Sequence, residues 1–309
     1  MIKVSILIPC YNAEQWVSQA VESALNQTAS DCEVICIDDG STDRTLKRLL
    51  AFGSRIRLET GPNQGGNQTR NRLLELSRGE WIQYLDADDY LKPEKIRNQL
   101  SDLLSNEQPD VLFGDVLVET TLPDGRVTQE IDPIPEVDDA WQLFCRWGLP
   151  QTGGYLWKKS ALNEVGGWNI KQQVCQENEL LLRLLKAGKK FLRTPGGDTV
   201  YRIWSDNTVC RRDPLRTLRT RYQLINDAVE HLDRTDKLPA SRARTVAQSK
   251  LQLAREAINY DRDLAFQIAS EVQQIMPAFV PDADRAFTST YRFAYRFLGF
   301  SVAEQLAQL

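Results

Sequence analysis

The sequence predicts an α/β protein with a mostly parallel central sheet, helices on both faces of that sheet, and a helical C-terminal region. Over the first 120 residues, short apolar segments alternate with amphipathic segments at helical spacing, and the connections are short. Beyond residue 212 the strand signals fade and the chain becomes rich in arginine and in helical periodicity. We therefore expect a first domain over residues 1–212 and a helical region over residues 213–309.

Each expected strand of the first domain is a short apolar run bounded by turn residues. These strands are expected at residues 3–9, 33–37, 56–59 and 81–85. Asn12 can cap the first helix, with Gln15 reaching back three residues later. Further helices are expected at residues 43–52, 67–76 and 93–104. Strands that alternate with helices in this way favour a parallel sheet that is covered on both faces.

The pattern becomes mixed after residue 110. Two strand-like runs, 111–121 and 127–131, flank the turn signal Pro123-Asp124-Gly125, which predicts a hairpin. Helices are expected at residues 138–146 and 177–187, and several more after Pro214. The sequence contains no internal repeat.

Composition narrows the function classes. The net charge of −4 and the pI near 5.3 argue against a broad nucleic-acid surface. No segment approaches the roughly 20 apolar residues that span a bilayer, and the N-terminal apolar run is too short for a signal peptide. Six scattered cysteines without a CxxC pair predict reduced thiols in a cytoplasmic protein. A single histidine argues against zinc.

Carboxylates follow two of the predicted strands. Asp86, Asp88 and Asp89 come directly after the strand at 81–85, and they would repel one another unless a positive group neutralised them. An exposed turn is the simpler alternative, but three carboxylates favour a hard cation, Mg²⁺ or Mn²⁺, shared with substrate phosphates. Asp38 and Asp39 follow the strand at 33–37. Because parallel strands end at the same edge of a sheet, both groups are expected to face one crevice.

Several short motifs, in this order and at this spacing, resemble the family 2 glycosyltransferases. They are Pro9–Glu14, Ala24–Thr28, Asp38–Asp43, Asn63–Gly65, Arg70-Asn71 and Leu85–Asp89. The likeness is strong over residues 1–105 and continues more weakly through 166–168 and 177–184. It implies a glycosyltransferase A-type fold and an inverting enzyme. Such an enzyme transfers sugar from a nucleotide-diphosphate sugar to a hydroxyl of a glycan or lipid-linked acceptor.

The resemblance also implies a donor-binding site. Asp39 would contact the base or ribose, with Asp38 behind it as a structural partner. A turn that only caps the helix at Asp43 is the alternative. Arg70 would reach the diphosphate with its planar guanidinium, unless it is simply a solvated charge on a helix. The full set of implied donor-binding residues is Pro9, Tyr11, Asn12, Asp38, Asp39, Arg70 and Asp86.

By the same resemblance, Asp86 and Asp88 form the metal-binding DxD motif. Asp88 would hold the metal, Asp86 would assist with metal or ribose, and Asp89 would support them. A divalent cation would stabilise the charge that develops on the departing diphosphate. The family often carries histidine in a Tyr-Arg-x-His arrangement, where this chain has Tyr201-Arg202-Ile203-Trp204. The metal would then either depend more on phosphate and water or bind weakly.

The roles of the nearby residues stay open in the sequence. Trp204 is expected to pack, with stacking on a sugar ring as the alternative. Arg202 and the pair Arg211-Arg212 would either touch the diphosphate or be solvated.

The acceptor hydroxyl needs a base to take its proton. The family supplies an Asp from a Glu-Asp pair after a Gly-Gly-aromatic turn, here Gly166-Gly167-Trp168. Alignment on the following leucines puts Glu177 in the Asp position. Glu179 is the competitor, and a role limited to the helix dipole is the alternative for Glu177.

Two other functions remain to be weighed. A non-catalytic nucleotide-sugar-binding module on the same fold is the main alternative, motivated by the missing histidine and the altered Glu-Asp pair. A dinucleotide-dependent oxidoreductase is disfavoured, since the first turn at 9–13 lacks GxGxxG.

The segment 287–300 mixes aromatic residues with arginine. It is therefore expected either to pack as ordinary helix, to form a homodimer contact, or to lie peripherally on a membrane.

Overall fold

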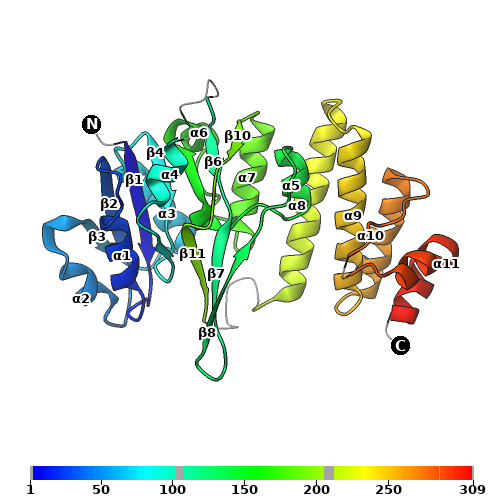
Figure 1. The fold of residues 1–309 in the computed structure, drawn as a ribbon, viewed down its shortest axis with the longest axis horizontal. Helices are drawn as coiled ribbons and strands as arrows, with labels where there is room; N and C mark the ends of the chain where they lie inside the picture. Colours follow the sequence, from blue (N-terminus) through cyan, green and yellow to red (C-terminus); the bar gives the residue numbers. More distant parts are fainter. Residues whose placement is uncertain (1–2, 102, 104–107, 205–211, 285, 308–309) are drawn as a thin grey trace. The chain divides into compact units, whose positions relative to one another are not determined.

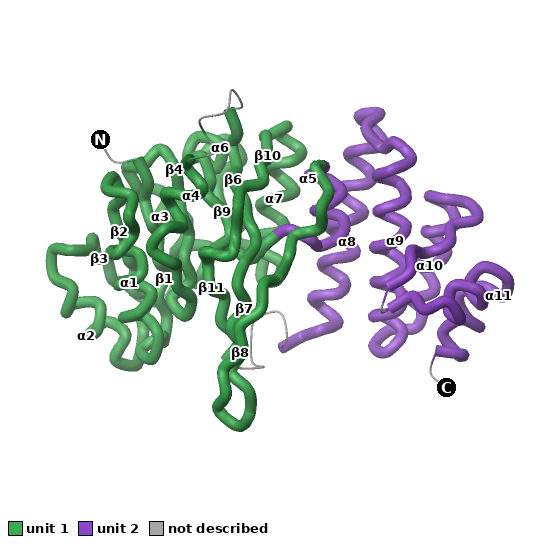
Figure 2. The backbone as a smooth tube through the Cα atoms, viewed as in Figure 1, with its two compact units in different colours: residues 1–138, 150–206 green, residues 139–149, 207–309 purple. Residues whose placement is uncertain are grey.

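The computed structural model describes residues 3–101, 103, 108–204, 212–284 and 286–307. The chain divides into two compact units (Figure 1, Figure 2). The first consists of residues 1–138 and 150–206, and the second of residues 139–149 and 207–309. Among the described residues, no helix is both long enough and apolar enough to cross a membrane.

The first unit is built on a seven-stranded sheet in the order β10-β6-β9-β4-β1-β2-β3. All its strands are parallel except β9, which runs antiparallel between β4 and β6. The strands are β1 (Val4–Cys10), β2 (Cys32–Asp39), β3 (Arg57–Gly61), β4 (Trp81–Tyr84), β6 (Val111–Phe113), β9 (Tyr155–Lys158) and β10 (Phe191–Arg193). The mostly parallel sheet that the sequence predicts is therefore present.

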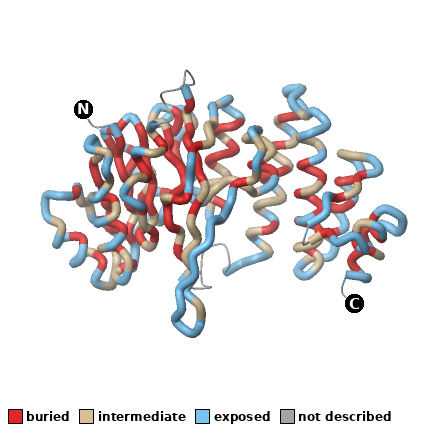
Figure 3. The backbone as a smooth tube through the Cα atoms, viewed as in Figure 1, coloured by how far each residue is buried: buried red, intermediate tan, exposed pale blue. Residues whose placement is uncertain are grey.

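Helices cover both faces of this sheet. Ile6 and Ile8 of β1 pack in one cluster with Val17 and Val21 from the first helix. Side chains of a strand alternate between faces, so Leu7 points to the opposite face, where α3 packs against β1. The central strands are buried along most of their length (Figure 3). The helices of this unit are α1 (Val17–Leu25), α2 (Thr45–Leu50), η1 (Gly53–Arg55), α3 (Gly66–Leu76), α4 (Lys95–Ser101), η3 (Thr152–Gly154), α6 (Lys159–Glu164) and α7 (Gln176–Lys186).

The predicted hairpin around Pro123-Asp124-Gly125 is present, since β7 and β8 pair antiparallel. It belongs to a second, four-stranded sheet in the order β5-β11-β7-β8, which was not predicted. The run at 111–121, expected as one strand, is split into β6 in the large sheet and β7 in the small one. Gly114 lies at the break, where a Cβ would come within 3.1 Å of backbone atoms at residues 194–196. The strands of this sheet are β5 (Tyr90–Leu91), β7 (Val116–Thr121), β8 (Val127–Asp132) and β11 (Thr199–Ile203).

The expected cap at Asn12 is wrong. The first helix begins at Val17, after Trp16, and no side chain caps it. Asn12 lies in the left-handed region with φ of 47°, and its Oδ1 accepts the backbone N–H of Thr42 at 2.8 Å. The amide that was assigned to the helix end instead joins the loop after β1 to the loop after β2.

The second unit is helical and includes one segment that the sequence placed in the first domain. Helix α5 (Ala140–Cys145) joins it because Arg242 Nε donates to Asp139 Oδ2 at 2.7 Å and the Trp141 ring stacks on His231. The domain boundary near residue 212 otherwise stays a prediction. The remaining helices are α8 (Pro214–Arg234), α9 (Ala240–Ala257), α10 (Arg262–Ile275) and α11 (Ser289–Ala307), the last with a kink at Gly299.

A buried carboxylate links β2 to the end of α3. Glu33 accepts from Ser5 Oγ at 2.6 Å, from the backbone N–H of Arg78 at 2.7 Å and from Arg78 Nε at 2.8 Å. Burial by itself would raise the pKa of Glu33, but the bonds from Ser5 and Arg78 lower it below its ordinary value. The ionised form is therefore favoured in the folded chain.

This linkage predicts a pH-dependent effect of Glu33→Gln. The native pKa is lowered, so the stabilisation from Glu33 is present above the ordinary pKa of about 4.3 and is lost as pH falls through the native pKa. We expect Glu33→Gln to reduce the free energy of unfolding at pH 7, because the hydrogen bonds to the carboxylate are weakened. The expected loss is only about 1 kcal/mol, since the Arg78 side chain is largely exposed and its ion pair is screened by water. Urea unfolding at pH 7 and at pH 3.5 should show this deficit shrinking at the lower pH. A deficit of equal size at both pH values would contradict the assignment.

Candidate active site

The carboxyl ends of β2 and β4 lie on either side of β1, at one edge of the large sheet. In the strand register, Cys10 of β1 pairs with Asp38 of β2, and Leu7 pairs with Tyr84 of β4. Because these three strands are parallel, the loops that follow them leave from the same edge. Asp38 and Asp39 end β2, and Asp86 follows β4 by two residues. The structure thus brings the two predicted acidic groups to one edge.

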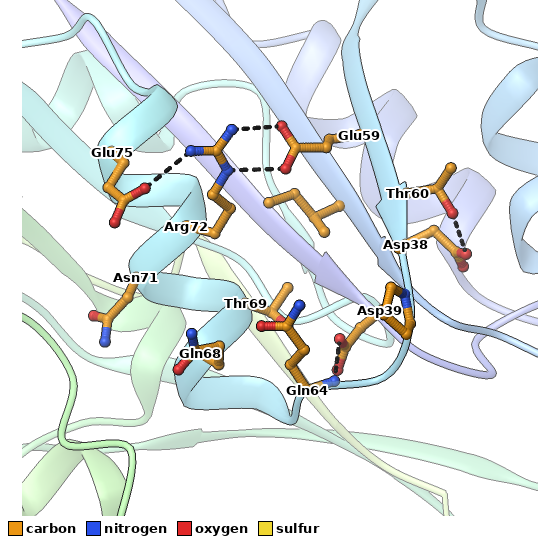
Figure 4. Close-up of a pocket in the computed structure, with 13 residues that line it drawn as sticks. Asp38, Asp39, Glu59, Thr60, Gln64, Gln68, Thr69, Asn71, Arg72 and Glu75 are labelled. Carbon is orange, nitrogen blue, oxygen red and sulfur yellow. Dashed lines mark hydrogen bonds and ion pairs between the residues drawn. The ribbon is translucent and has the colours of Figure 1, made fainter.

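Asp39 lies at a pocket of about 230 Å³ between β2, β3 and α3 (Figure 4). Its carboxylate accepts the backbone N–H groups of Gln64 at 2.8 Å and Gly65 at 3.0 Å, just before α3 begins. Asp38 Oδ2 accepts from Thr60 Oγ1 at 3.1 Å, whereas Asp38 Oδ1 is buried with no hydrogen-bond partner. The pocket is below the roughly 300 Å³ that a complete ligand site usually needs, so it suits one ring-sized group.

The other donor-binding candidates at this edge belong to the loop after β1. Pro9 pairs with Ile37 in the strand register, and Tyr11 is 52% exposed. The backbone N–H of Asn12 donates to Ser41 Oγ at 3.0 Å. The backbone N–H of Ala13 donates to Thr45 Oγ1 at 2.8 Å, at the start of α2. These bonds lock the two loops together, and Tyr11 stays exposed beside them.

The Arg70 side chain is only 12% exposed and is paired, so the alternative of a solvated helix charge is wrong. Its Nη2 donates to Asp86 Oδ1 at 2.7 Å, and its guanidinium carbon lies 4.8 Å from the ring centroid of Trp168. Arg70 Nε is buried without a hydrogen-bond partner. Burial alone would lower the pKa of Arg70, but the charges of Asp86 and Glu177 raise it. The guanidinium therefore remains charged and lies between the DxD motif and α7.

The acidic turn after β4 concentrates negative charge. Burial first, and then the charge of Asp86, raise the pKa of Asp88. Burial and the charges of Asp88 and Asp86 raise the pKa of Asp89 well above its ordinary value. The repulsion expected from the sequence is thus present, and a bound cation at this turn would relieve it.

Two residues at the end of β11 hold this turn. The backbone N–H of Arg202 donates to Asp89 Oδ1 at 2.8 Å, and Arg202 Nη1 donates to the Asp88 carbonyl at 2.9 Å. Trp204 Nε1 donates to Asp88 Oδ2 at 3.0 Å, while its side chain stays 49% exposed. Trp204 therefore contacts the DxD motif directly, in addition to its packing against the Trp16 ring.

One alternative from the sequence was that Arg202 touches the diphosphate. The structure instead directs its guanidinium to other protein groups. Arg202 is 6% exposed, and its remaining donors go to Glu119 Oε1 at 2.9 Å and Gln19 Oε1 at 2.6 Å. Neither partner was singled out from the sequence. Both lie far from Arg202 along the chain, and no local pattern indicates the pairing. Arg211 lies outside the described residues, and Arg212 has no assigned role.

Among the residues that the structure describes, the acidic turn is not completed into a metal site by protein ligands alone. In the described part of the chain, no group of three or more His, Cys, Asp or Glu side chains could hold a metal ion. The carboxylate of Asp89 is turned to the backbone of Arg202, which leaves Asp86 and Asp88. Two carboxylates fit Mg²⁺ or Mn²⁺ when water and substrate phosphates complete the shell.

Glu177 lies near the start of α7, close to the acidic turn. Thr152 Oγ1 donates to Glu177 Oε1, and Thr152 is fixed because η3 packs against β11, where Thr199 Oγ1 donates to the Gly153 carbonyl at 2.9 Å. Burial first, and then the charges of the acidic turn and of Glu177, together raise the pKa of Tyr201 to about 12. Glu177 therefore shares one electrostatic environment with the acidic turn.

Glu179 is committed elsewhere. It forms a bidentate ion pair with Arg183, at 2.9 and 2.8 Å, and Arg183 also donates to the Gly167 carbonyl at 2.7 Å. This arrangement fixes the Gly-Gly-aromatic turn against α7. The Glu179 side chain is thus part of the scaffold beside the candidate base.

Comparisons with known proteins identify the family of this chain. The model of glycosyl transferase family 2 matches residues 5–133. A Haemophilus influenzae protein described as an uncharacterized glycosyltransferase is 31% identical over 243 residues, which covers 75% of this chain and 78% of that protein. The chondroitin synthase of Pasteurella multocida is 39% identical over 107 residues, covering 34% of this chain. That match spans only 11% of the length of the synthase. A match to another Haemophilus influenzae glycosyltransferase spans 43% of the length of that glycosyltransferase.

Solved structures share the fold. Staphylococcus aureus TarS 1–349 in complex with UDP-GlcNAc has a TM-score of 0.63 at 14% identity, covering 99% of this chain and 91% of that one. The mannosyltransferase PcManGT of Pyrobaculum calidifontis, in complex with GDP-Man and Mn²⁺, has a TM-score of 0.55 at 12% identity, covering 98% and 86%. The fold is therefore of the glycosyltransferase A type. The family model and the Haemophilus influenzae relative that matches over most of its length show that the chain belongs to glycosyltransferase family 2.

Proposed function

We propose that this chain is a metal-dependent, inverting glycosyltransferase. It would transfer sugar from a nucleotide-diphosphate sugar to a hydroxyl of a glycan or lipid-linked acceptor. The observation that carries the proposal is the meeting of Asp39, Asp86 and Glu177 around α3. Asp39 accepts hydrogen bonds from the residues that precede this helix. Arg70 on the helix donates to Asp86, and the charge of Glu177 raises the pKa of Arg70.

The donor would lie along this edge of the sheet. Asp39 would receive the base or ribose at its pocket, and Pro9, Tyr11 and Asn12 would line the approach. The complexes of TarS with UDP-GlcNAc and of PcManGT with GDP-Man support a nucleotide sugar as the donor. Neither fixes the base or the sugar for this chain.

The diphosphate would lie between Arg70 and the acidic turn. Asp86 and Asp88 would hold Mg²⁺ or Mn²⁺, which when bound stabilises the negative charge on the departing diphosphate by several kcal/mol. The Mn²⁺ in the PcManGT complex supports this choice of ion. Arg70 donates to Asp86 and stays positively charged, so it would attract a phosphate oxygen bound beside this turn.

Glu177 would act as the base. Its carboxylate would take the proton of the acceptor hydroxyl as that oxygen attacks the sugar from the side opposite the diphosphate, which inverts the anomeric centre. The hydroxyl of Thr152 donates to one carboxylate oxygen and so holds the side chain in one orientation. Glu179 is disfavoured because both its oxygens bond Arg183.

Asp88→Ala tests the metal site. We expect the variant to lose at least about 100-fold in Mn²⁺-dependent donor hydrolysis, because several kcal/mol of electrostatic stabilisation would be removed. A thermal-shift screen against UDP-, GDP-, CDP- and dTDP-sugars, with and without Mn²⁺, selects the donor for this assay. Unchanged hydrolysis in Asp88→Ala would show that the metal lies elsewhere.

Glu177→Gln and Glu179→Gln form a matched pair that tests the base. Glu177→Gln should reduce transfer to an acceptor by about 10²–10⁴-fold, since proton removal is lost, while donor binding is retained. Glu179→Gln should leave transfer close to wild type and lower only the melting temperature. The reverse pattern would identify Glu179 as the base.

A second candidate function is a nucleotide-sugar-binding module without turnover. Trp204 in place of the family histidine, and Gln176-Glu177 in place of the Glu-Asp pair, favour it. Calorimetry that shows donor binding, combined with neither hydrolysis nor transfer across a broad acceptor panel, would select this function over the enzyme.

We also propose that α11 makes a peripheral contact, either with a membrane or with a second copy of the chain, in the cytoplasm. Phe293 and Phe297 are 64% and 61% exposed, and their rings lie 4.8 Å apart. The double variant Phe293→Ser/Phe297→Ser should lose either flotation with anionic vesicles or the dimer seen by sedimentation. A wild-type chain that neither floats nor dimerises would refute this contact.

A further inference from the structure

The indole of Trp204 holds one specific oxygen of the DxD motif. Trp204 directly follows β11, and its Nε1–H donates to Asp88 Oδ2 at 3.0 Å. In the described part of the chain, no other residue's side chain bonds this carboxylate. One oxygen of Asp88 is thus occupied by a neutral donor, and Oδ1 is left for another partner.

The position of this indole is fixed by packing. The Trp204 ring lies 6.2 Å from the Trp16 ring, and the guanidinium of Arg202 lies 4.7 Å from the same Trp16 ring. Arg202 in turn bonds the Asp88 carbonyl at 2.9 Å. Asp88 is therefore held at its backbone by Arg202 and at its carboxylate by Trp204. Such double fixation limits the rotation of the carboxylate about its side-chain torsions.

An indole N–H is a donor only and has no lone pair to offer a metal. Trp204 cannot replace the histidine of the family arrangement as a ligand. It can, however, orient a ligand, because a hydrogen bond to the distal oxygen of a coordinating carboxylate sets the direction of the other oxygen.

We propose that Trp204 is a positioning residue for the metal site, which fixes Asp88 through Oδ2 so that Oδ1 remains available to Mg²⁺ or Mn²⁺. This inference rests on the proposed function. It explains how a site to which the described residues contribute two carboxylates, and no histidine, keeps an ordered ligand. It also assigns a role to an exposed tryptophan whose packing contact alone would not require the N–H group.

Mn²⁺ binding to the full chain tests the proposal without any activity measurement. Free Mn²⁺ is followed by electron paramagnetic resonance during titration, with Mn²⁺ alone and with Mn²⁺ plus UDP. Trp204→Phe keeps a ring against Trp16 but removes the N–H. We expect this variant to raise the Mn²⁺ dissociation constant by about 10–100-fold, the usual effect of removing a group that orients a metal ligand. Its urea midpoint should match that of wild type.

Two further variants control the experiment. Trp204→His restores a ring N–H donor or adds a direct ligand, so it should bind Mn²⁺ at least as tightly as wild type. Trp141→Phe makes the same chemical change in the helical unit and should leave Mn²⁺ affinity unchanged.

The outcomes separate this inference from the proposed function. If wild type binds Mn²⁺ and Asp88→Asn abolishes that binding, but Trp204→Phe binds as tightly as wild type or more tightly, the positioning role is overturned while the metal site stands. If wild type shows no Mn²⁺ binding that depends on Asp88 in either arm, the metal site of the proposed function fails, and this inference fails with it.

Discussion

The buried guanidinium of Arg202 is the interaction on which the rest of the site depends. A buried charge is tolerated only when its hydrogen bonds and its charge are matched. Arg202 meets this condition with Glu119, Gln19 and the carbonyl of Asp88, and its backbone N–H serves Asp89. Two aromatic rings flank the guanidinium. The positive charge thereby offsets the repulsion at Asp88 and Asp89, while Arg70 pairs with Asp86. One carboxylate oxygen each of Asp86 and Asp88 is left for a ligand.

Helix α3 connects the acidic turn to the pocket beside Asp39. Asp39 fixes the loop that starts the helix, and Arg70, one turn later, fixes Asp86 and lies against the Trp168 ring. The pocket beside Asp39 and the acidic turn are therefore connected through one rigid element. The negative charge of Glu177 also acts on Arg70, whose pKa it raises. A single ligand with a ring at one end and a diphosphate in the middle matches this sequence of groups.

Much of this could be predicted from the sequence, because the strands that precede the aspartates are mostly apolar runs with clear ends, interrupted in β4 by Gln83 alone. The shared edge then follows from parallel pairing alone. The antiparallel β9, between β4 and β6, could not be predicted, since it is four residues long and its partners are distant in the sequence. For the same reason the pairing of Arg202 with Glu119 was missed. Asn12 was misassigned because a helix cap and a loop-to-loop bond favour the same residue types.

The central claim is that the aspartates after β2 and β4 serve one ligand. Anomalous diffraction from crystals grown with Mn²⁺ and the nucleotide sugar selected by thermal shift tests it most directly. We predict one Mn²⁺ peak in contact with Asp88 and the diphosphate, and a nucleobase beside Asp39. A Mn²⁺ peak away from Asp86 and Asp88, or a nucleobase bound away from Asp39, would contradict the account.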